Sequence, residues 1–314
     1  MIMRQDTEKA MSRQTWDRLT ERTTAQDWPA ASLYVVATPI GNLADLSLRA
    51  WQALLHCDVI AAEDTRVSRS LLDAWGISTP LMAAHQHNEA QAAQAIIERL
   101  SRGERVGLVS DAGAPAVSDP GARIVRRVNE AGYRVIPVPG PSAVIAALMG
   151  SGATSDENPA FVFAGFMPPK SAARKQWLRD WCFLPAPVVM FESPHRLRAA
   201  LTDIADICGS DRHVTLAREL SKRFEQIETM PAGQVADWLA GDAHRLQGEF
   251  VLIVHQQRKS GLDTEAGQGD LVLIDALLES LSVRDTARIV AKVTDLSRDT
   301  AYKLALARSA GTRA

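Results

Sequence analysis

Residues 105–121, RVGLVSDAGAPAVSDPG, are the stretch that decides the fold of this 314-residue chain. The apolar run 105–109 predicts a short buried strand, and the Gly, Pro, Ser and Asp residues after it predict a loop. In a parallel sheet, loops that leave the carboxyl ends of the strands carry the functional groups. The glycines let backbone amides approach a ligand, and Asp111 and Asp119 supply carboxylates. A tight turn closed by Asp and Gly, without a ligand, fits the same spacing.

The residues of this loop suit a cationic ligand better than a phosphate. Neither G-x-G-x-x-G nor G-x-x-x-x-G-K-[ST] occurs in the sequence, and carboxylates repel pyrophosphate. S-adenosylmethionine carries a sulfonium and an ammonium for carboxylates, and a carboxylate and an adenine for backbone groups. The loop therefore indicates S-adenosylmethionine as the cofactor.

Outward from this loop, apolar runs alternate with helical patterns on both sides. Alternation of this kind predicts right-handed βαβ crossovers and a mainly parallel sheet. In the first half, strands are expected at 33–36, 58–62, 105–109 and 134–138, and helices at 46–55, 70–75 and 90–100. In the second half, strands are expected at 161–164, 188–191, 214–217 and 250–255, and helices at 172–181, 197–207 and 234–239. The fold class is therefore α/β, with two α/β domains.

Changes in composition predict the domain boundaries. A polar segment at 151–159 separates an α/β domain at 32–152 from a second one at 153–257. Residues 1–31 lack apolar periodicity and predict a flexible leader, and 258–270 predicts a linker. The tail, 271–314, predicts short helices at 271–281, 283–293 and 300–308, with Ser282 and Ser297 as N-caps, in a helix-turn-helix-like pattern.

Composition excludes several classes of protein. With 46% hydrophobic and 23% charged residues the chain is globular, and a net charge of −2 does not by itself indicate nucleic acid. No apolar run reaches the roughly 18 residues of a membrane span. Cys57, Cys182 and Cys208 are too widely spaced for a metal or redox motif and fit a reducing cytoplasm.

A series of motifs follows in order along the chain: 38–45 (TPIGNLAD), 62–66 (AEDTR), 110–113 (SDAG), 118–121 (SDPG), 138–142 (VPGPS), 191–196 (FESPHR), 217–220 (AREL) and 248–254 (GEFVLIV). These motifs resemble those of the tetrapyrrole-methylase superfamily of class III methyltransferases, and more closely its branch that acts on small-subunit ribosomal RNA. Residues 302–306 (YKLAL) resemble the helical tail of that branch. Ala114 and Ala116 depart from the Thr and Leu common in the family, so cofactor contacts there should rely on backbone groups.

The resemblance implies a cytoplasmic homodimer that binds S-adenosylmethionine between its two α/β domains. The expected reaction is 2′-O-methylation of the ribose of a decoding-region cytidine, of the cytidine 1402 type, in 16S rRNA within the 30S subunit. A tetrapyrrole C-methyltransferase is one alternative, although the neutral 38–41 loop, the basic second domain and the tail argue against it. A non-catalytic RNA-binding factor is the other.

By the same resemblance, cofactor contacts are expected from Pro39, Ile40, Asp111, Gly113, Ala114, Ser142, Ala143, Phe191, Ala217 and Gly248. For Phe191 and Ala217, simple core packing is an equal alternative. Asp111 follows a strand end between flexible turns, where its charge has little structural use.

Methyl transfer to a ribose hydroxyl depends mainly on alignment, and a carboxylate or histidine can accept the proton. The candidates are Glu63, Asp64, Glu192, His195 and Glu219, with Arg66, Arg196 and Arg218 orienting them or gripping phosphate. Asp64 is the first choice for the base because it ends a predicted strand beside Arg66. A structural ion pair or N-cap formed by these two residues is the alternative.

Basic residues recur at helical spacing in the second domain and predict an RNA-binding surface. Those at helical spacing are Lys170, Arg174, Lys175 and Arg179, and the second domain adds Arg196, Arg198, Arg218, Lys222 and Arg223. An ordinary solvated helix face is the alternative. His85 and His87, followed by Glu89, have the spacing of a metal site. No further ligand group is evident in the sequence, so no metal site is predicted.

Overall fold

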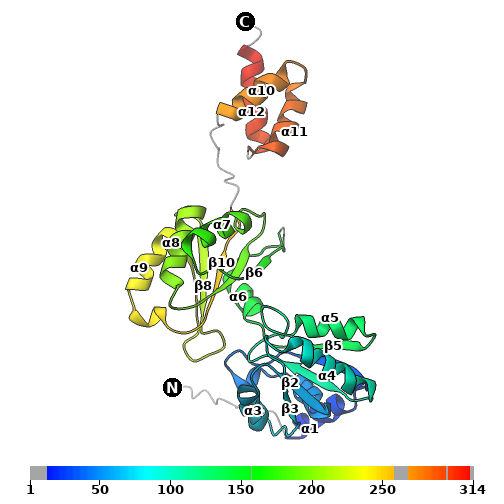
Figure 1. Cartoon of the computed structure of the whole chain (residues 1–314). Coiled ribbons are helices and arrows are strands. Elements are labelled where there is room, and N and C mark those ends of the chain that lie inside the picture. Colours follow the sequence, from blue (N-terminus) through cyan, green and yellow to red (C-terminus); the bar gives the residue numbers. More distant parts are fainter. Residues whose placement is uncertain (1–12, 157, 258–267, 295, 312–314) are drawn as a thin grey trace, which may run out of the picture. The chain divides into compact units, whose positions relative to one another are not determined.

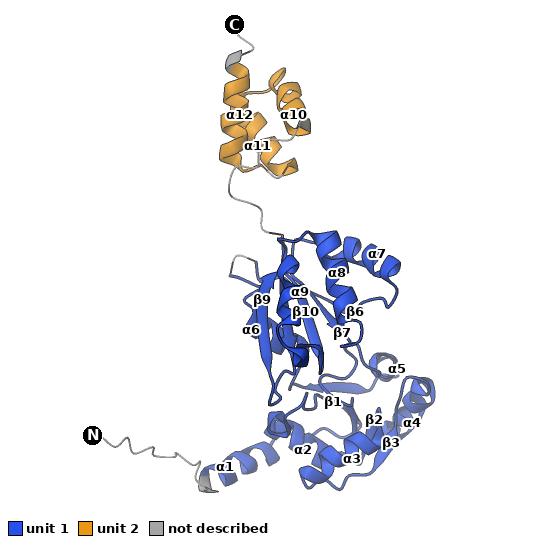
Figure 2. Cartoon of the chain, turned by 90° about the vertical axis from the view of Figure 1, so that its left-hand side faces the viewer, with its two compact units in different colours: residues 1–256 blue, residues 257–314 orange. Residues whose placement is uncertain are grey.

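The computed structural model describes residues 13–156, 158–257, 268–294 and 296–311. Contacts between residues divide the chain into two compact units, residues 1–256 and 257–314, which Figure 2 colours blue and orange. Both α/β domains expected from the sequence belong to the first unit, and the predicted helical tail belongs to the second. No helix among the described residues is long and apolar enough to cross a membrane.

The first sheet of unit 1 is entirely parallel. Its strands are β1 (Ser32–Val36), β2 (Val59–Ala62), β3 (Leu81–Ala83), β4 (Val106–Val109) and β5 (Arg134–Val138), in the order β3-β2-β4-β1-β5. Because all strands run the same way, their carboxyl ends meet at one edge, where the loop after β4 begins.

Helices cover both faces of this sheet. They are α2 (Leu48–His56), α3 (Thr65–Ala74), α4 (Glu89–Ser101) and α5 (Ala122–Glu130). Strand alternation divides the core: Tyr34 and Val36 pack with the α2 side, whereas Leu33 and Val35 pack with α4 and α5. The short 3-10 helix η1 (Leu43–Asp45) follows β1, and Asn42 caps it.

The second sheet is mixed. Its strands are β6 (Val162–Phe166), β7 (Val188–Glu192), β10 (Phe250–Val254), β8 (His213–Arg218) and β9 (Gln226–Pro231), in that spatial order. β6 and β7 are parallel, but β10 is antiparallel to both β7 and β8. The start of β10 therefore lies at the same edge as the ends of β7 and β8, with Phe250 opposite Glu192 and Arg218.

The helices of the second half pack on this sheet (Figure 1). They are α7 (Ser171–Trp181), α8 (Leu197–Cys208) and α9 (Val235–Ala240), with 3-10 turns at Ala232–Gln234 and Ala243–Leu246. Helix α6 (Ala143–Ser151) also packs here, since Val144, Ala147 and Leu148 contact Val189 and Val251 in one core cluster. It precedes the predicted boundary at 152 but buries its apolar side against the second sheet.

The N-terminal segment is more ordered than a flexible leader. Residues Arg13–Thr24 form α1. Trp28 is buried and stacks on His56 with ring centroids 5.1 Å apart, and its carbonyl accepts a bond from Arg105 Nε. An aromatic side chain with a core partner orders a segment that lacks periodicity of its own. Residues 1–12 of the expected leader and 258–267 of the expected linker lie outside the described residues.

Unit 2 consists of three described helices, α10 (Gln268–Leu278), α11 (Val283–Val293) and α12 (Arg298–Gly311). Ile274, Val290 and Leu296 form its apolar centre with small alanines from α11 and α12. Ser282 accepts a bond from the Asp285 amide and Ser297 accepts one from the Thr300 amide, so both serines act as the expected caps. Helix α10 begins at Gln268, three residues before the predicted helix start at residue 271.

Candidate functional site

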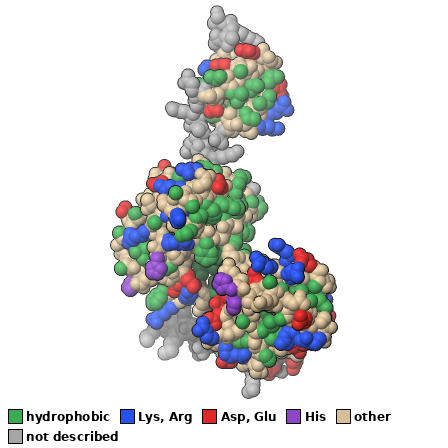
Figure 3. Space-filling view, in the orientation of Figure 1, with side chains coloured by type: hydrophobic (Ala, Val, Ile, Leu, Met, Phe, Trp, Pro, Cys, Tyr) green, Lys and Arg blue, Asp and Glu red, His purple; other side chains and the backbone are tan. Residues whose placement is uncertain are grey.

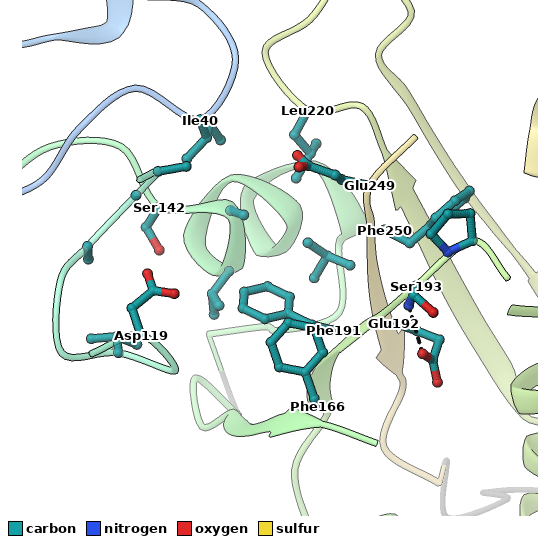
Figure 4. Close-up of a pocket in the computed structure, with 18 residues that line it drawn as sticks. Ile40, Asp119, Ser142, Phe166, Phe191, Glu192, Ser193, Leu220, Glu249 and Phe250 are labelled. Atoms are coloured by element: carbon teal, nitrogen blue, oxygen red, sulfur yellow. Dashed lines mark hydrogen bonds between the residues drawn. The ribbon is translucent and has the colours of Figure 1, made fainter. Parts of the chain in front are cut away.

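A cavity of about 370 Å³ lies in unit 1, between the strand ends of the two sheets (Figure 4). Both halves of unit 1 contribute to its wall. The first half contributes Ile40, Ala112, Gly113, Ala114, Val117, Asp119, Ser142, Ala143 and Val144. The second half contributes Phe166, Phe191, Glu192, Ser193, Pro194, Leu220, Glu249, Phe250 and Val251. Its size and mostly apolar lining with a few polar groups are those of a small-molecule site.

Backbone hydrogen bonds join the loops after β1 and β4. The Thr38 amide donates to the Gly113 carbonyl at 2.9 Å, and the Gly113 amide donates to the Thr38 carbonyl at 3.0 Å. Gly113 has a φ of +77°, which a residue with a Cβ rarely adopts. This pairing holds Ile40 and Ala114 on the same wall of the cavity.

The loop after β4 is also held in an unusual backbone conformation. Ala116 and Ser118 have φ values of 68° and 62°, in the left-handed region that non-glycine residues disfavour. Two bonds hold the loop: the Ala116 amide donates to the Pro120 carbonyl at 3.2 Å, and the Gly121 amide donates to Glu89 Oε1 at 2.7 Å. Glu89 therefore has a structural role. Strain of this kind concentrates at functional loops.

Aromatic and charged groups form the opposite wall. The Phe191 ring, at the end of β7, contacts Phe163 and Phe166 edge-to-face, with centroids 5.0 Å and 5.2 Å apart. Beside it, Glu192 is buried and accepts bonds from the Ser193 amide and from Arg196 Nε, each at 2.7 Å. Glu192 Oε2 is buried and has no hydrogen-bond partner among the described residues. The Glu192–Arg196 pair fixes the turn that brings Ser193 to the cavity.

Acidic residues gather at the first-sheet side of the cavity. Asp111 Oδ1 accepts a bond from the Asp64 amide at 3.0 Å, and Glu63 Oε2 accepts one from the Asp111 amide at 3.5 Å. Burial, and then the charge of Asp111, raise the pKa of Glu63. Burial also raises the pKa of Asp119, which lines the cavity itself. Carboxyl groups with raised pKa values in a cleft are candidates for proton transfer or for binding a cation.

Asp64 differs from its acidic neighbours. It caps α3 by accepting a bond from the Arg66 amide at 2.8 Å, and it forms an ion pair with the Arg66 guanidinium at 2.7 Å. The side-chain bond to Arg66 holds the pKa of Asp64 far below its ordinary value. The structure therefore shows the cap and ion pair that the sequence left as the alternative, and so acidic a group is a poor proton acceptor.

The structure brings most of the expected cofactor residues together. Ile40, Gly113, Ala114, Ser142, Ala143 and Phe191 line the cavity. The others, Pro39, Asp111, Ala217 and Gly248, lie outside its lining. Ala217 is fully buried in the core between α6 and the second sheet, which is the packing alternative. Gly248 has a φ of +96°, and an added Cβ would lie 2.4 Å from Glu219 Oε1, so close packing explains this glycine.

Several lining residues were not expected as cofactor contacts from the sequence. Asp119 is expected only as a carboxylate of the loop, and the sequence assigns no cofactor contact to Phe166, Leu220, Glu249 or Phe250. Among the base candidates, His195 is exposed beside the lining residue Pro194. Glu219 accepts bonds from Lys222 Nζ and the Glu249 amide, both at 3.0 Å, so it holds a turn.

Two of the expected RNA-binding residues are buried and require correction. Arg174 is 2% exposed and forms an ion pair with Asp203 at 2.6 Å. Arg218 is 8% exposed and donates to the Gln247 carbonyl. Neither partner could be inferred from the sequence, because Asp203 and Gln247 each lie 29 residues away along the chain. Lys175 and Arg196 are partly exposed but ion-paired, whereas Lys170 and Arg223 are exposed.

Replacing Arg174 with Ala should destabilise the fold by about 3–5 kcal/mol, because Asp203 would stay buried without its main partner. The lower end of this range is expected, because Lys175 Nζ lies 3.4 Å from Asp203 Oδ1 and would still partly balance its charge. Urea unfolding measures the change, and Lys170→Ala on the exposed side is the matched control, expected within about 0.5 kcal/mol. Normal unfolding of the Arg174 variant together with weaker RNA binding would restore Arg174 as an RNA contact.

Among the residues that the structure describes, no group of three or more His, Cys, Asp or Glu side chains is placed to hold a metal ion. The His85 and His87 rings lie edge-to-face with centroids 6.1 Å apart.

A parallel sheet and a mixed sheet flank the cavity, and comparison with known families assigns this fold to a class of methyltransferases. The profile of the Tetrapyrrole (Corrin/Porphyrin) Methylases matches residues 32–236, and that of the RsmI C-terminal HTH domain matches residues 267–309. The fold is similar to that of a cobalt precorrin-4 methyltransferase from cobalamin biosynthesis, with a TM-score of 0.52 and 15% identity, covering 71% of this chain and 95% of that one. It is also similar to uroporphyrin-III-C-methyltransferase from Thermus thermophilus, with a TM-score of 0.52 and 17% identity, covering 72% and 94% of the two chains.

Sequence comparison narrows the class to one branch. The chain is 43% identical over 279 residues to the ribosomal RNA small subunit methyltransferase I of Pseudomonas aeruginosa, covering 89% of this chain and 98% of that protein. It is 44% identical over 278 residues to the protein of the same name from Neisseria meningitidis, covering 88% and 93%. The chain belongs to the ribosomal RNA small subunit methyltransferase I family.

Proposed function

We propose that this protein methylates small-subunit ribosomal RNA with S-adenosylmethionine, at the ribose 2′-hydroxyl of a cytidine of the 1402 type in 16S rRNA. The names of its relatives support the RNA substrate. The observation that carries the proposal is the cavity between the two sheets, because six residues expected to contact the cofactor line it together.

The residues of the cavity fit S-adenosylmethionine group by group. Phe191, Leu220 and Phe250 offer apolar surface for an adenine ring. Asp119 offers a partly buried carboxylate for a cation, and Figure 4 shows it on the same wall as Ser142. Ser142 is the N-cap residue of α6, and its side chain makes no capping bond. Backbone amides at the start of a helix attract a carboxylate.

When bound, the cofactor supplies an activated methyl group. The chain's own contribution is to hold the ribose in line and to accept its hydroxyl proton. We propose Glu63 as the proton acceptor, since its pKa is raised and its carboxylate lies beside the Asp111 amide at the edge of the cavity loop. Asp64, with its lowered pKa, would orient α3 through Arg66.

A basic surface near the cavity supports binding of RNA. Figure 3 shows Lys and Arg side chains gathered over α5, which begins immediately after the cavity loop. The exposed residues of this helix include Arg123, Arg126 and Arg127. Positive charge at this place can track phosphates and steer an RNA toward the site. The substrate would be the 30S subunit, in the cytoplasm.

A homodimer is part of the same proposal. Ile145 and Met149 of α6 are 47% and 83% exposed, and apolar side chains of this size on a surface suit contact with a second copy of the chain.

The main rival is C-methylation of a tetrapyrrole, because the fold is similar to that of a uroporphyrin-III-C-methyltransferase. Incubating the protein with radiolabelled S-adenosylmethionine and either 30S subunits or a porphyrinogen separates the possibilities. Label in 16S rRNA supports the proposal, and label in the porphyrinogen overturns it. Binding of RNA without label in either substrate indicates a non-catalytic RNA-binding factor.

Asp119→Asn should weaken binding of S-adenosylmethionine by about ten- to a hundred-fold, the loss expected when a charge-assisted contact of about 1.5–3 kcal/mol is removed. Binding of S-adenosylhomocysteine, which lacks the sulfonium charge, should weaken less. Equilibrium dialysis with both ligands gives the ratio of the two dissociation constants. Asp73→Asn, on the exposed side of α3, is the matched control. Unchanged binding of both ligands by the Asp119 variant would remove Asp119 from the cation site.

A further inference from the structure

Strand β6 ends in an irregularity that turns one aromatic ring toward the cavity. β6 is an edge strand, and its pairing with β7 shifts register between Phe163 and Phe166. Gly165 lies in this bulge with a φ of +72°, a conformation that glycine adopts without strain. After the bulge, Phe166 is 58% exposed and lines the cavity. Bulges that redirect a side chain recur beside active sites.

Phe166 is the outermost member of a group of three rings. Phe191 contacts Phe163 on one side and Phe166 on the other, with centroids 5.0 Å and 5.2 Å apart. Phe163 and Phe191 pack against the core between α6 and the sheet. Figure 4 shows the Phe166 ring beside that of Phe191, on the side away from α6. The inner rings therefore fix the position of Phe166, whereas much of the Phe166 ring faces solvent.

A second exposed apolar side chain lines the same cavity from the other half of unit 1. Val117, in the strained loop after β4, is 48% exposed. The loop comes close to the bulge, since a Cβ built on Gly165 would lie 3.3 Å from Ser118 Oγ. Phe166 and Val117 thus belong to adjoining segments. The exposed parts of Phe166 and Val117 form apolar surface inside the cavity. Exposed apolar surface in a cavity typically marks a ligand-binding site.

We propose that Phe166 and Val117 form a stacking site for a nucleobase of the RNA substrate; this inference rests on the proposed function and assigns a binding site for part of its substrate. A base has two apolar faces, so a ring held edge-on by Phe191 and a branched aliphatic group suit it. The loop that carries Val117 continues into α5, whose arginines can hold the neighbouring phosphates. Stacking on an aromatic ring is the usual way in which proteins bind an unpaired base.

The test compares Phe166→Ala and Phe166→Trp in full-length protein, with 30S subunits as the substrate. Phe166→Ala should raise KM for 30S subunits by about ten-fold or more, the loss expected from one base stack. Phe166→Trp should keep KM near that of the wild type, because it preserves a flat aromatic surface. The dissociation constant of S-adenosylmethionine should change by less than about two-fold in both variants, since the two inner rings remain. Melting temperatures verify folding.

Phe161→Ala is the matched control, because Phe161 is 42% exposed just before β6 but does not line the cavity. An unchanged KM in Phe166→Ala would overturn the stacking site. A large loss of cofactor binding in Phe166→Ala, with no change in KM at saturating cofactor, would also overturn it and assign the ring to the cofactor. Failure of the wild type to methylate 30S subunits would instead contradict the proposed function, so the two failures are distinguishable.

Discussion

Glu63→Gln should lower kcat for methylation of 30S subunits by about 100- to 10,000-fold, the usual contribution of a general base. Glutamine keeps the size of the side chain and an oxygen that can accept the Asp111 amide, but it cannot take the ribose proton. Binding of S-adenosylmethionine should stay close to that of the wild type. Single-turnover measurements with saturating cofactor isolate the chemical step.

Asp64→Asn is the matched control for this experiment, because Asp64 is the adjacent carboxylate and has a strongly lowered pKa. It should cost some stability through the α3 cap and little in kcat. The raised pKa of Glu63 also sets the pH dependence: activity should fall as pH drops through that pKa, at a higher pH than an ordinary glutamate gives. Full turnover by Glu63→Gln, or a large loss only in Asp64→Asn, would return the role of base to Asp64.

Ala114→Trp should abolish detectable binding of S-adenosylmethionine, the largest effect expected on the cofactor. Ala114 lines the cavity from the loop after β4, and an indole there would fill much of a space of about 370 Å³. The site is on a loop, so the fold should survive, and a melting curve tests this directly. Equilibrium dialysis with radiolabelled cofactor measures the loss.

The conservative control at the same position is Ala114→Thr. Threonine adds a hydroxyl and a methyl group, so it tests whether moderate size is tolerated, and it should bind the cofactor at least as well as the wild type. Equal binding by the Trp and wild-type proteins would place the cofactor elsewhere.

Much of the fold could be predicted because buried strands are short apolar runs. Strand β3 was missed because Leu81 and Met82 are only partly buried and Ala83 is exposed, so the segment lacks the pattern of a buried strand. Helix α6 was missed for the opposite reason: its sequence, AVIAALMGS, is apolar on every side and has no helical stripe. Helix α5 was missed as well, because three of its nine residues are arginines and only Ile124 and Val128 are fully buried, which leaves a short apolar stripe.

The candidate site could be predicted only where it consists of loops rich in Gly and Asp. The residues Glu249 and Phe250 could not be placed, because they reach the cavity only through the antiparallel direction of β10, which brings its first residue opposite Glu192. A βαβ pattern does not reveal a strand that runs the other way. Phe166 was missed because its exposure depends on a bulge at Gly165.

Basic residues show the same limit of sequence patterns. By spacing, Arg174 fits an exposed helix face, yet its side chain is buried and forms an ion pair with Asp203 on α8. Arginine in a helix therefore indicates a surface only when no carboxylate from another element can reach it.

Calorimetric titration of the purified full-length protein with S-adenosylmethionine tests the cofactor cavity most directly, since it needs neither RNA nor turnover. The cavity predicts saturable heat at one site per chain, and competition by S-adenosylhomocysteine. Absence of heat with both molecules, in the presence of 30S subunits as well, would contradict the assignment of the cavity and with it the proposed methyl transfer.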